Sequence, residues 1–173
     1  MIQSYQPQQP PPKIEPRGFF AGVKIRPIIA GAVVDYLATY VFTFLYLIFF
    51  FMKEPLEGGG PSQEAFEKAV NEMLSSPEAL VALSLIGALC TALGGYVAAR
   101  LARAEHIKHG ALVGAVSLVI GALQMSAVEA GYSLPYWYEI VAYIVTIPAG
   151  ALGGFFAQTE KEMRSGGGGP PSV

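Results

Sequence analysis

Asp35 is the one ionisable residue inside the first long apolar stretch of the sequence, which covers residues 27–52. Thr39 and Thr43 follow it at spacings of four, so on a helix the three polar side chains share one face. A carboxylate inside a membrane costs about 2.5–3.5 kcal/mol on insertion scales, and such residues often mark ion or proton pathways. The pattern predicts either a proton or cation site, with Gln124 as a further polar neighbour, or a carboxyl group that fixes helix packing.

Other residue types that carry catalysis or bind cofactors are scarce. One cysteine excludes an intramolecular disulfide, and the two histidines, His106 and His109, stand three residues apart in a short basic connection. The sequence contains no nucleophile-elbow, zinc-protease, P-loop or dinucleotide-binding motif. We therefore expect no enzyme activity, no cofactor and no metal site, and we expect both histidines to be solvated at the interface.

The composition is that of a membrane protein. Of the 173 residues, 53% are hydrophobic and only 14% are charged, whereas soluble domains have about 25% charged residues. This balance excludes a soluble domain, a disordered chain and a basic nucleic-acid binder. We expect the lipid bilayer to surround the chain, and we expect its partners to be other membrane-protein subunits or a second copy of itself, with no nucleic acid.

Four apolar stretches are long enough to cross a bilayer, and they cover residues 27–52, 77–99, 110–130 and 135–157. None of them alternates with a period of two, so the sequence predicts an all-α membrane protein with four transmembrane helices over residues 27–160. Between the first two spans, the apolar stripe of residues 62–75 predicts an external amphipathic helix. The chain ends are expected to be a Gln- and Pro-rich tail with a basic interfacial segment (1–26) and a flexible Gly- and Pro-rich tail (161–173).

The basic residues near the ends of the spans predict the orientation. Nine of the eleven Lys and Arg residues fall on one side of the predicted membrane: Lys13, Arg17, Lys24, Arg26, Arg100, Arg103, Lys108, Lys161 and Arg164. Because cytoplasmic connections carry an excess of Lys and Arg, we expect both termini in the cytoplasm and the chain in a bacterial inner membrane.

Small residues at helical spacing predict where helices approach closely, because lipid provides no hydrophobic drive between helices. They form stripes on three spans: Gly87, Thr91 and Gly95; Gly110, Gly114, Ser117 and Gly121; and Gly150 and Gly154. The similar segments 92–98 (ALGGYVA) and 151–157 (ALGGFFA) predict a parallel tandem repeat of two helical hairpins. Aromatic residues at the start of the last span predict an interfacial belt, made of Tyr132, Tyr136, Trp137 and Tyr138.

The segment 94–114 has a Gly-Gly-Tyr helix end, a basic turn and a His-Gly-Ala helix start. In this it resembles a group of uncharacterised bacterial four-helix membrane proteins. The resemblance implies a bacterial inner membrane and four helices, and it implies no activity. Taken with the missing catalytic motifs, the sequence favours a non-catalytic accessory or structural subunit of a larger inner-membrane assembly. The alternative is a small proton- or ion-coupled transporter that acts as a homodimer and is centred on Asp35.

Overall fold

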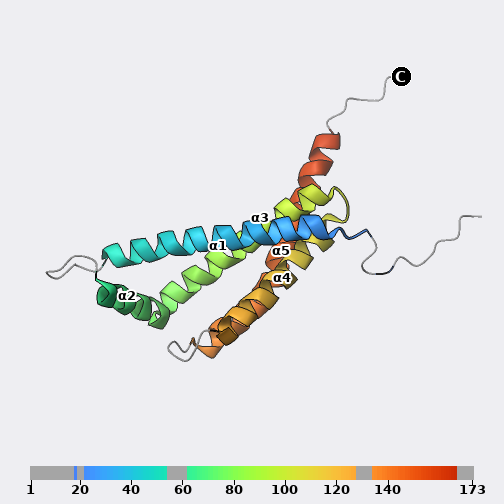
Figure 1. Cartoon of the computed structure of the whole chain (residues 1–173). Helices are drawn as coiled ribbons and strands as arrows, with labels where there is room; N and C mark the ends of the chain where they lie inside the picture. Colours follow the sequence, from blue (N-terminus) through green and yellow to red (C-terminus); the bar gives the residue numbers. More distant parts are fainter. Residues whose placement is uncertain (1–17, 19–21, 54–61, 128–133, 167–173) are drawn as a thin grey trace, which may run out of the picture.

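The computed structural model describes residues 18, 22–53, 62–127 and 134–166, and nearly all of these lie in helices (Figure 1). The helices are α1 (Ile25–Lys53), α2 (Gln63–Ser75), α3 (Pro77–Ala102), α4 (His106–Ala127) and α5 (Tyr136–Gly166). Four of them, α1, α3, α4 and α5, are long and apolar enough to cross a membrane. Over the described residues, the prediction of an all-helical fold with four such helices is confirmed. The last helix continues well beyond the predicted end of its apolar stretch.

Local sequence signals explain where the helices begin and end. The Ser62 side chain accepts a hydrogen bond from the backbone of Ala65 and caps α2. Ser76 caps α3 in the same way, and Pro77 occupies the first turn, where its missing N–H is not needed. The connection from α3 to α4 turns sharply because Arg103 adopts a left-handed conformation.

The four long helices alternate in direction, so α1 and α4 run one way and α3 and α5 run the other. We call the end that carries Lys24, Arg100, Lys108 and Arg164 the basic end, and the other end the open end. Helix α3 packs against α1, α4 and α5, whereas α1 and α5 do not pack against each other within the described residues. Figure 1 shows α1 crossing α4 and α5 near the basic end and separating from them toward the open end.

Backbones come into contact in the basic half of the bundle. A Cβ atom added to Gly31 of α1 would lie 2.7 Å from Ala98 Cβ of α3, and one added to Gly114 of α4 would lie 2.6 Å from the Thr146 carbonyl oxygen of α5. A Cβ atom added to any of four other glycines in the predicted stripes would also clash with the backbone of a neighbouring helix: Gly95, Gly110, Gly150 and Gly154. Only glycine lets the helix backbones come this close. The resulting van der Waals contact holds the helices together in lipid, where there is no hydrophobic driving force between them.

The prediction of close packing is wrong at Gly87 and Gly121. A Cβ at either position would have no neighbour within 4 Å, because the helices have already separated at this level. Both glycines instead border a cavity. The small-residue stripes therefore mark contact at the basic end and open space toward the open end.

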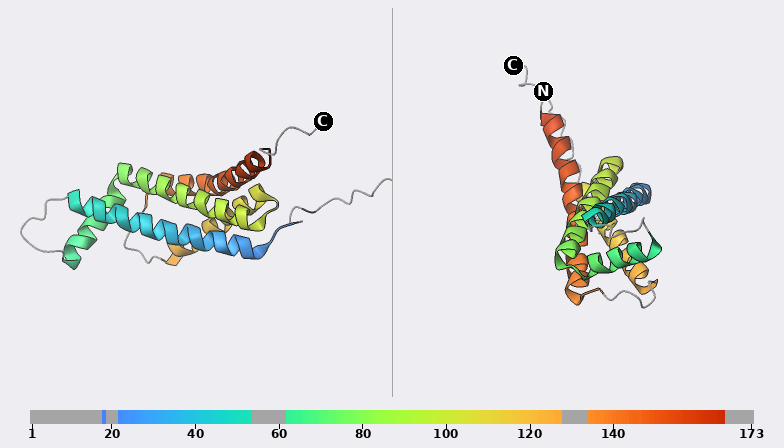
Figure 2. Two further views of the ribbon diagram at one scale, coloured as in Figure 1. Left: turned by 90° about the horizontal axis from the view of Figure 1, so that it is seen from above. Right: turned by 90° about the vertical axis from the view of Figure 1, so that its left-hand side faces the viewer.

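Helix α2 lies across the end at which α1 finishes and α3 begins, as both views in Figure 2 show. Its Ala69 and Met73 are buried, whereas Phe66 at the start of the expected apolar stripe is 48% exposed. Within the described residues α2 packs against α1 and α3 and does not contact α4 or α5. It therefore braces one side of the bundle and leaves the other side uncovered.

His109 at the basic end is fully buried, which corrects the expectation that it is solvated. Its Nδ1 donates to the Glu105 carbonyl oxygen at 2.9 Å, and its Nε2 accepts from the Lys24 backbone N–H at 2.9 Å. The Lys24 ammonium group also donates to the Ala102 carbonyl oxygen. These bonds tie the residue just before α1 to the α3–α4 connection and help to close the basic end.

Candidate functional site

A cavity of about 490 Å³ lies between α1, α3, α4 and α5. Asp35, Thr91 and Ser117 border its inner part, and Thr43 and Tyr138 border it nearer the open end. Toward the basic end it stops where α1 and α3 touch, since a Cβ on Gly94 would lie 2.8 Å from the Cβ of Asp35. The cavity therefore extends from the middle of the bundle toward the open end.

The carboxylate of Asp35 accepts hydrogen bonds from hydroxyl groups on three helices. Thr39 of α1 donates to Oδ1 at 3.4 Å, Thr91 of α3 lies 3.2 Å from both oxygens, and Ser117 of α4 donates to Oδ2. Asp35 is only 4% exposed, so these donors replace the water that a carboxylate normally binds. Hydroxyl groups that converge on a carboxylate stabilise its charged form.

The three donors differ from other hydroxyl groups in the same helices. Serine and threonine in a helix often bond the carbonyl four residues back, as Ser84 does to Leu80 and Thr146 does to Ala142. The hydroxyl groups of Thr39, Thr91 and Ser117 are directed at Asp35 instead. Three helices thus each direct one hydroxyl group at the same carboxylate. We call the hydroxyl groups of Thr39, Thr91 and Ser117 the hydroxyl shell.

No lysine, arginine or histidine pairs with Asp35 in the part of the chain that the structure describes. The ion pairs found there are on the surface, such as Arg100 with Glu160 and Lys108 with Glu105. A buried carboxylate without a cationic partner is unfavourable in a membrane unless a proton or a bound cation balances its charge. The arrangement can therefore hold either one, and exchange between them needs no further reacting group.

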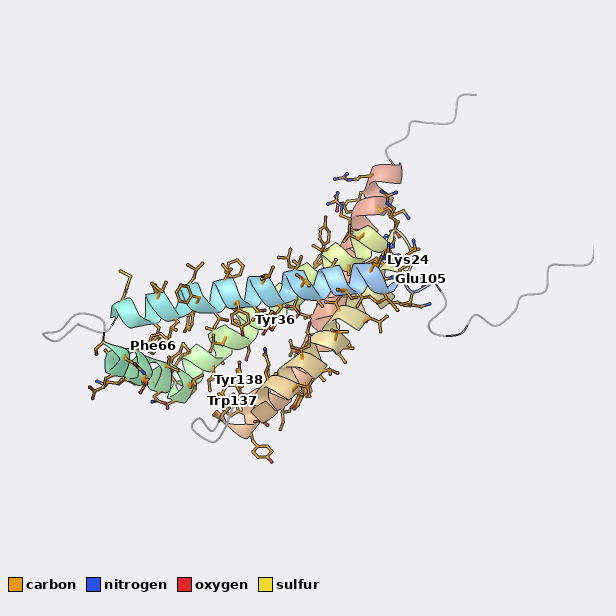
Figure 3. The ribbon with its side chains drawn as sticks, in the orientation of Figure 1. Lys24, Tyr36, Phe66, Glu105, Trp137 and Tyr138 are labelled. Carbon is orange, nitrogen blue, oxygen red and sulfur yellow. The ribbon has the colours of Figure 1, made fainter. Side chains whose placement is uncertain are left out.

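A polar bridge crosses the cavity one residue beyond Asp35. The Gln124 side chain of α4 donates to the Tyr36 hydroxyl of α1 at 2.6 Å, and that hydroxyl in turn donates to Tyr40 at 3.2 Å. Tyr36 and Tyr138 come from opposite walls, α1 and α5, as Figure 3 shows. The Gln124–Tyr36 bridge joins two helices that otherwise separate toward the open end, so it lies on the route from that end to Asp35.

The structure brings together the four residues predicted from the sequence as a transport site. Asp35, Thr39, Thr43 and Gln124 all line the cavity, although no hydrogen bond joins Thr43 or Gln124 to Asp35. Thr91 and Ser117 stand in stripes of small residues and were expected to serve helix packing, so their hydrogen bonds to Asp35 were not predicted. Their hydroxyl groups were the available signal.

The predicted aromatic belt divides between two environments. Tyr136 is 84% exposed and Trp137 is also exposed, whereas Tyr138 lines the cavity and packs edge-on against Trp137. Tyr132 lies outside the described residues. Tyr138 therefore belongs with the cavity and not with the outer surface.

The described residues contain no group of three or more His, Cys, Asp and Glu side chains that is placed to hold a metal ion. Comparison of the chain with protein-family models, with curated proteins and with solved structures finds no match. The chemistry of the cavity is therefore defined by the residues that line it, with Asp35 as the charged group.

Proposed function

We propose that the chain is a small multi-pass membrane transporter in which Asp35 exchanges a proton for a monovalent cation. The observation that carries the proposal is the Asp35 carboxylate itself. It is buried, it accepts bonds from three hydroxyl groups, it has no cationic partner among the described residues, and it borders a cavity that leads to the open end. A carboxylate in this setting needs a positive charge from outside the protein.

The cavity favours transport over the accessory-subunit function. A carboxylate that only fixed helix packing would need partners on neighbouring helices, but it would not need space beside it. Here Gly87 and Gly121 leave open the space next to the hydroxyl shell, and both border the cavity. A binding function explains why glycines occupy these two positions, although no neighbouring helix lies close to either of them.

The basic end is proposed to face the cytoplasm of a bacterial inner membrane, because lysine and arginine concentrate on that side of membrane proteins. Both termini then lie in the cytoplasm, and the cavity opens to the opposite side of the membrane. The outward surface of α1, which exposes Leu37, Val41 and Phe44 among other large apolar residues, is proposed to contact lipid.

Reconstitution into liposomes tests this function. Protein-containing vesicles with a pH-sensitive dye inside and an imposed pH gradient are exposed in turn to several monovalent inorganic and organic cations. We expect at least one cation to dissipate the gradient with the native protein. Asp35→Asn keeps the size and hydrogen-bonding capacity of the side chain but removes its charge, so its rate is expected to fall to that of empty vesicles.

Ser84→Ala is the matched control, because Ser84 lines the same cavity but donates to its own helix. This variant is expected to keep the native rate. A native rate for folded Asp35→Asn, or no cation-dependent flux with the native protein, would rule out the transport proposal and favour an accessory role.

A further inference from the structure

We propose that the cation bound at Asp35 is organic and monovalent, with an ammonium-type head group at the carboxylate and an apolar body in the rest of the cavity. This inference rests on the proposed exchange function and names its substrate class. It follows from the volume of the cavity, its single acidic residue, its largely apolar lining and the uninterrupted helices around Asp35.

The volume of the cavity sets the size of the ligand. About 490 Å³ falls within the range of roughly 300–1,000 Å³ that is typical of sites for small organic molecules. A bare alkali-metal ion or a proton would occupy only a small part of this volume. An organic ligand fills it.

The walls of the cavity set the charge and polarity of the ligand. Among the described residues that line the cavity, Asp35 is the only aspartate, glutamate, lysine, arginine or histidine, so the site can balance one positive charge. Beyond the hydroxyl shell the lining is largely apolar, with Leu83, Ile120 and Val145 from three different helices. The rings of tyrosines such as Tyr36 add surfaces that attract organic cations.

The backbone argues against a dehydrated metal ion as the ligand. Sodium sites in membrane transporters commonly use carbonyl groups that an interrupted helix sets free. Here α1, α3 and α4 remain helical past Asp35, Thr91 and Ser117, so their carbonyl groups stay within the helix hydrogen-bond ladders. The three hydroxyl groups already donate to the carboxylate, which leaves it as a single negative centre suited to a large cation.

Calorimetric binding to the full-length protein in detergent tests the inference with three probes: benzyltrimethylammonium, sodium and potassium chlorides. We expect benzyltrimethylammonium to bind the native protein and Asp35→Asn to weaken that binding by roughly thirtyfold or more, because the charge partner is lost. Gly121→Leu should weaken it to a similar degree, since the new side chain enters the open space at Gly121 without touching the carboxylate.

Val119→Leu is the control for the second variant, because Val119 is exposed on the same helix and is not among the residues that line the cavity, so this variant is expected to bind like the native protein. If Gly121→Leu does not fold, Gly87→Leu places the same obstruction on α3, where a Cβ also meets no neighbour. Thermal unfolding in the same detergent establishes that each variant is folded.

The outcomes separate the two proposals. Binding of benzyltrimethylammonium that is lost in both Asp35→Asn and Gly121→Leu supports the organic cation. Asp35-dependent binding of sodium or potassium without benzyltrimethylammonium overturns the substrate class and leaves the exchange function standing. If benzyltrimethylammonium binds the native protein and both variants equally well, the proposed substrate class is also wrong. A protein that binds no cation in an Asp35-dependent way overturns both.

Discussion

Asp35 illustrates how a residue of one helix acquires its role from two others. Thr39 comes from the same helix at a spacing of four, so its place beside Asp35 followed from the sequence. Thr91 and Ser117 reach the carboxylate from α3 and α4, and spacing along the chain does not determine which side chains of those helices bond to α1. Small hydroxyl residues such as Thr91 and Ser117 are also common where membrane helices pack together. A single sequence therefore does not show which of them bond to a distant carboxylate.

Thr91→Val tests whether the hydroxyl shell stabilises the charged carboxylate. Valine keeps the shape of threonine but removes the donor to both oxygens of Asp35. A hydrogen bond to a charged group contributes about 1.5–3 kcal/mol, so we expect the bound cation to dissociate roughly ten to a hundred times more readily at a given pH. Cation dissociation constants measured over a series of pH values detect this change.

Thr146→Val is the matched control, because Thr146 borders the same cavity but donates to the Ala142 carbonyl oxygen. Its affinity is expected to remain native within about a factor of two, since the hydroxyl group that is lost does not donate to Asp35. If Thr91→Val and Thr146→Val bind the cation equally well, the hydroxyl shell has no part in binding.

At the scale of helices, length and composition were enough to predict the spans, because a bilayer leaves few alternatives to long apolar helices. The level at which the helices separate was not predictable. Gly114 and Gly121 stand two turns apart on α4 and look equivalent in the sequence, yet only Gly114 meets another backbone. The burial of His109 was missed for a similar reason, since the segment before α1 covers it from far along the chain.

The pair Gly114→Ala and Gly121→Ala measures this difference directly. At Gly114 the new methyl group would lie 2.6 Å from the Thr146 carbonyl oxygen and 2.8 Å from the Ile147 Cα atom, so α4 and α5 must move apart. We expect a destabilisation of about 1–3 kcal/mol, the usual cost of overpacking. Unfolding of the purified protein by titration with a denaturing detergent provides the measurement.

Gly121→Ala should be neutral or slightly stabilising, because no atom lies within 4 Å of the new Cβ and alanine favours helix by about 1 kcal/mol over glycine. Equal destabilisation by the two substitutions would mean that the helices do not separate between Gly114 and Gly121.

For the molecule as a whole, the glycine contacts and the His109 bonds close one end, while the separation of α1 from α5 opens the other. The resulting cavity lies toward the open end, with Asp35 at its inner end. Transport through such a site requires a second state in which the basic end opens and the open end closes. The hydrogen bond from Gln124 to Tyr36 joins α1 and α4 on the side of Asp35 that faces the open end.

If a proton and a cation compete for Asp35, binding of the cation must displace the proton, and the number of protons released can be measured. Full-length protein in weakly buffered detergent solution, with a pH indicator present, receives saturating benzyltrimethylammonium, sodium or potassium over a series of starting pH values. We expect cation binding to release up to one proton per chain from the native protein and none from Asp35→Asn. Cation binding without proton release at every starting pH, or equal release from folded Asp35→Asn, would contradict it.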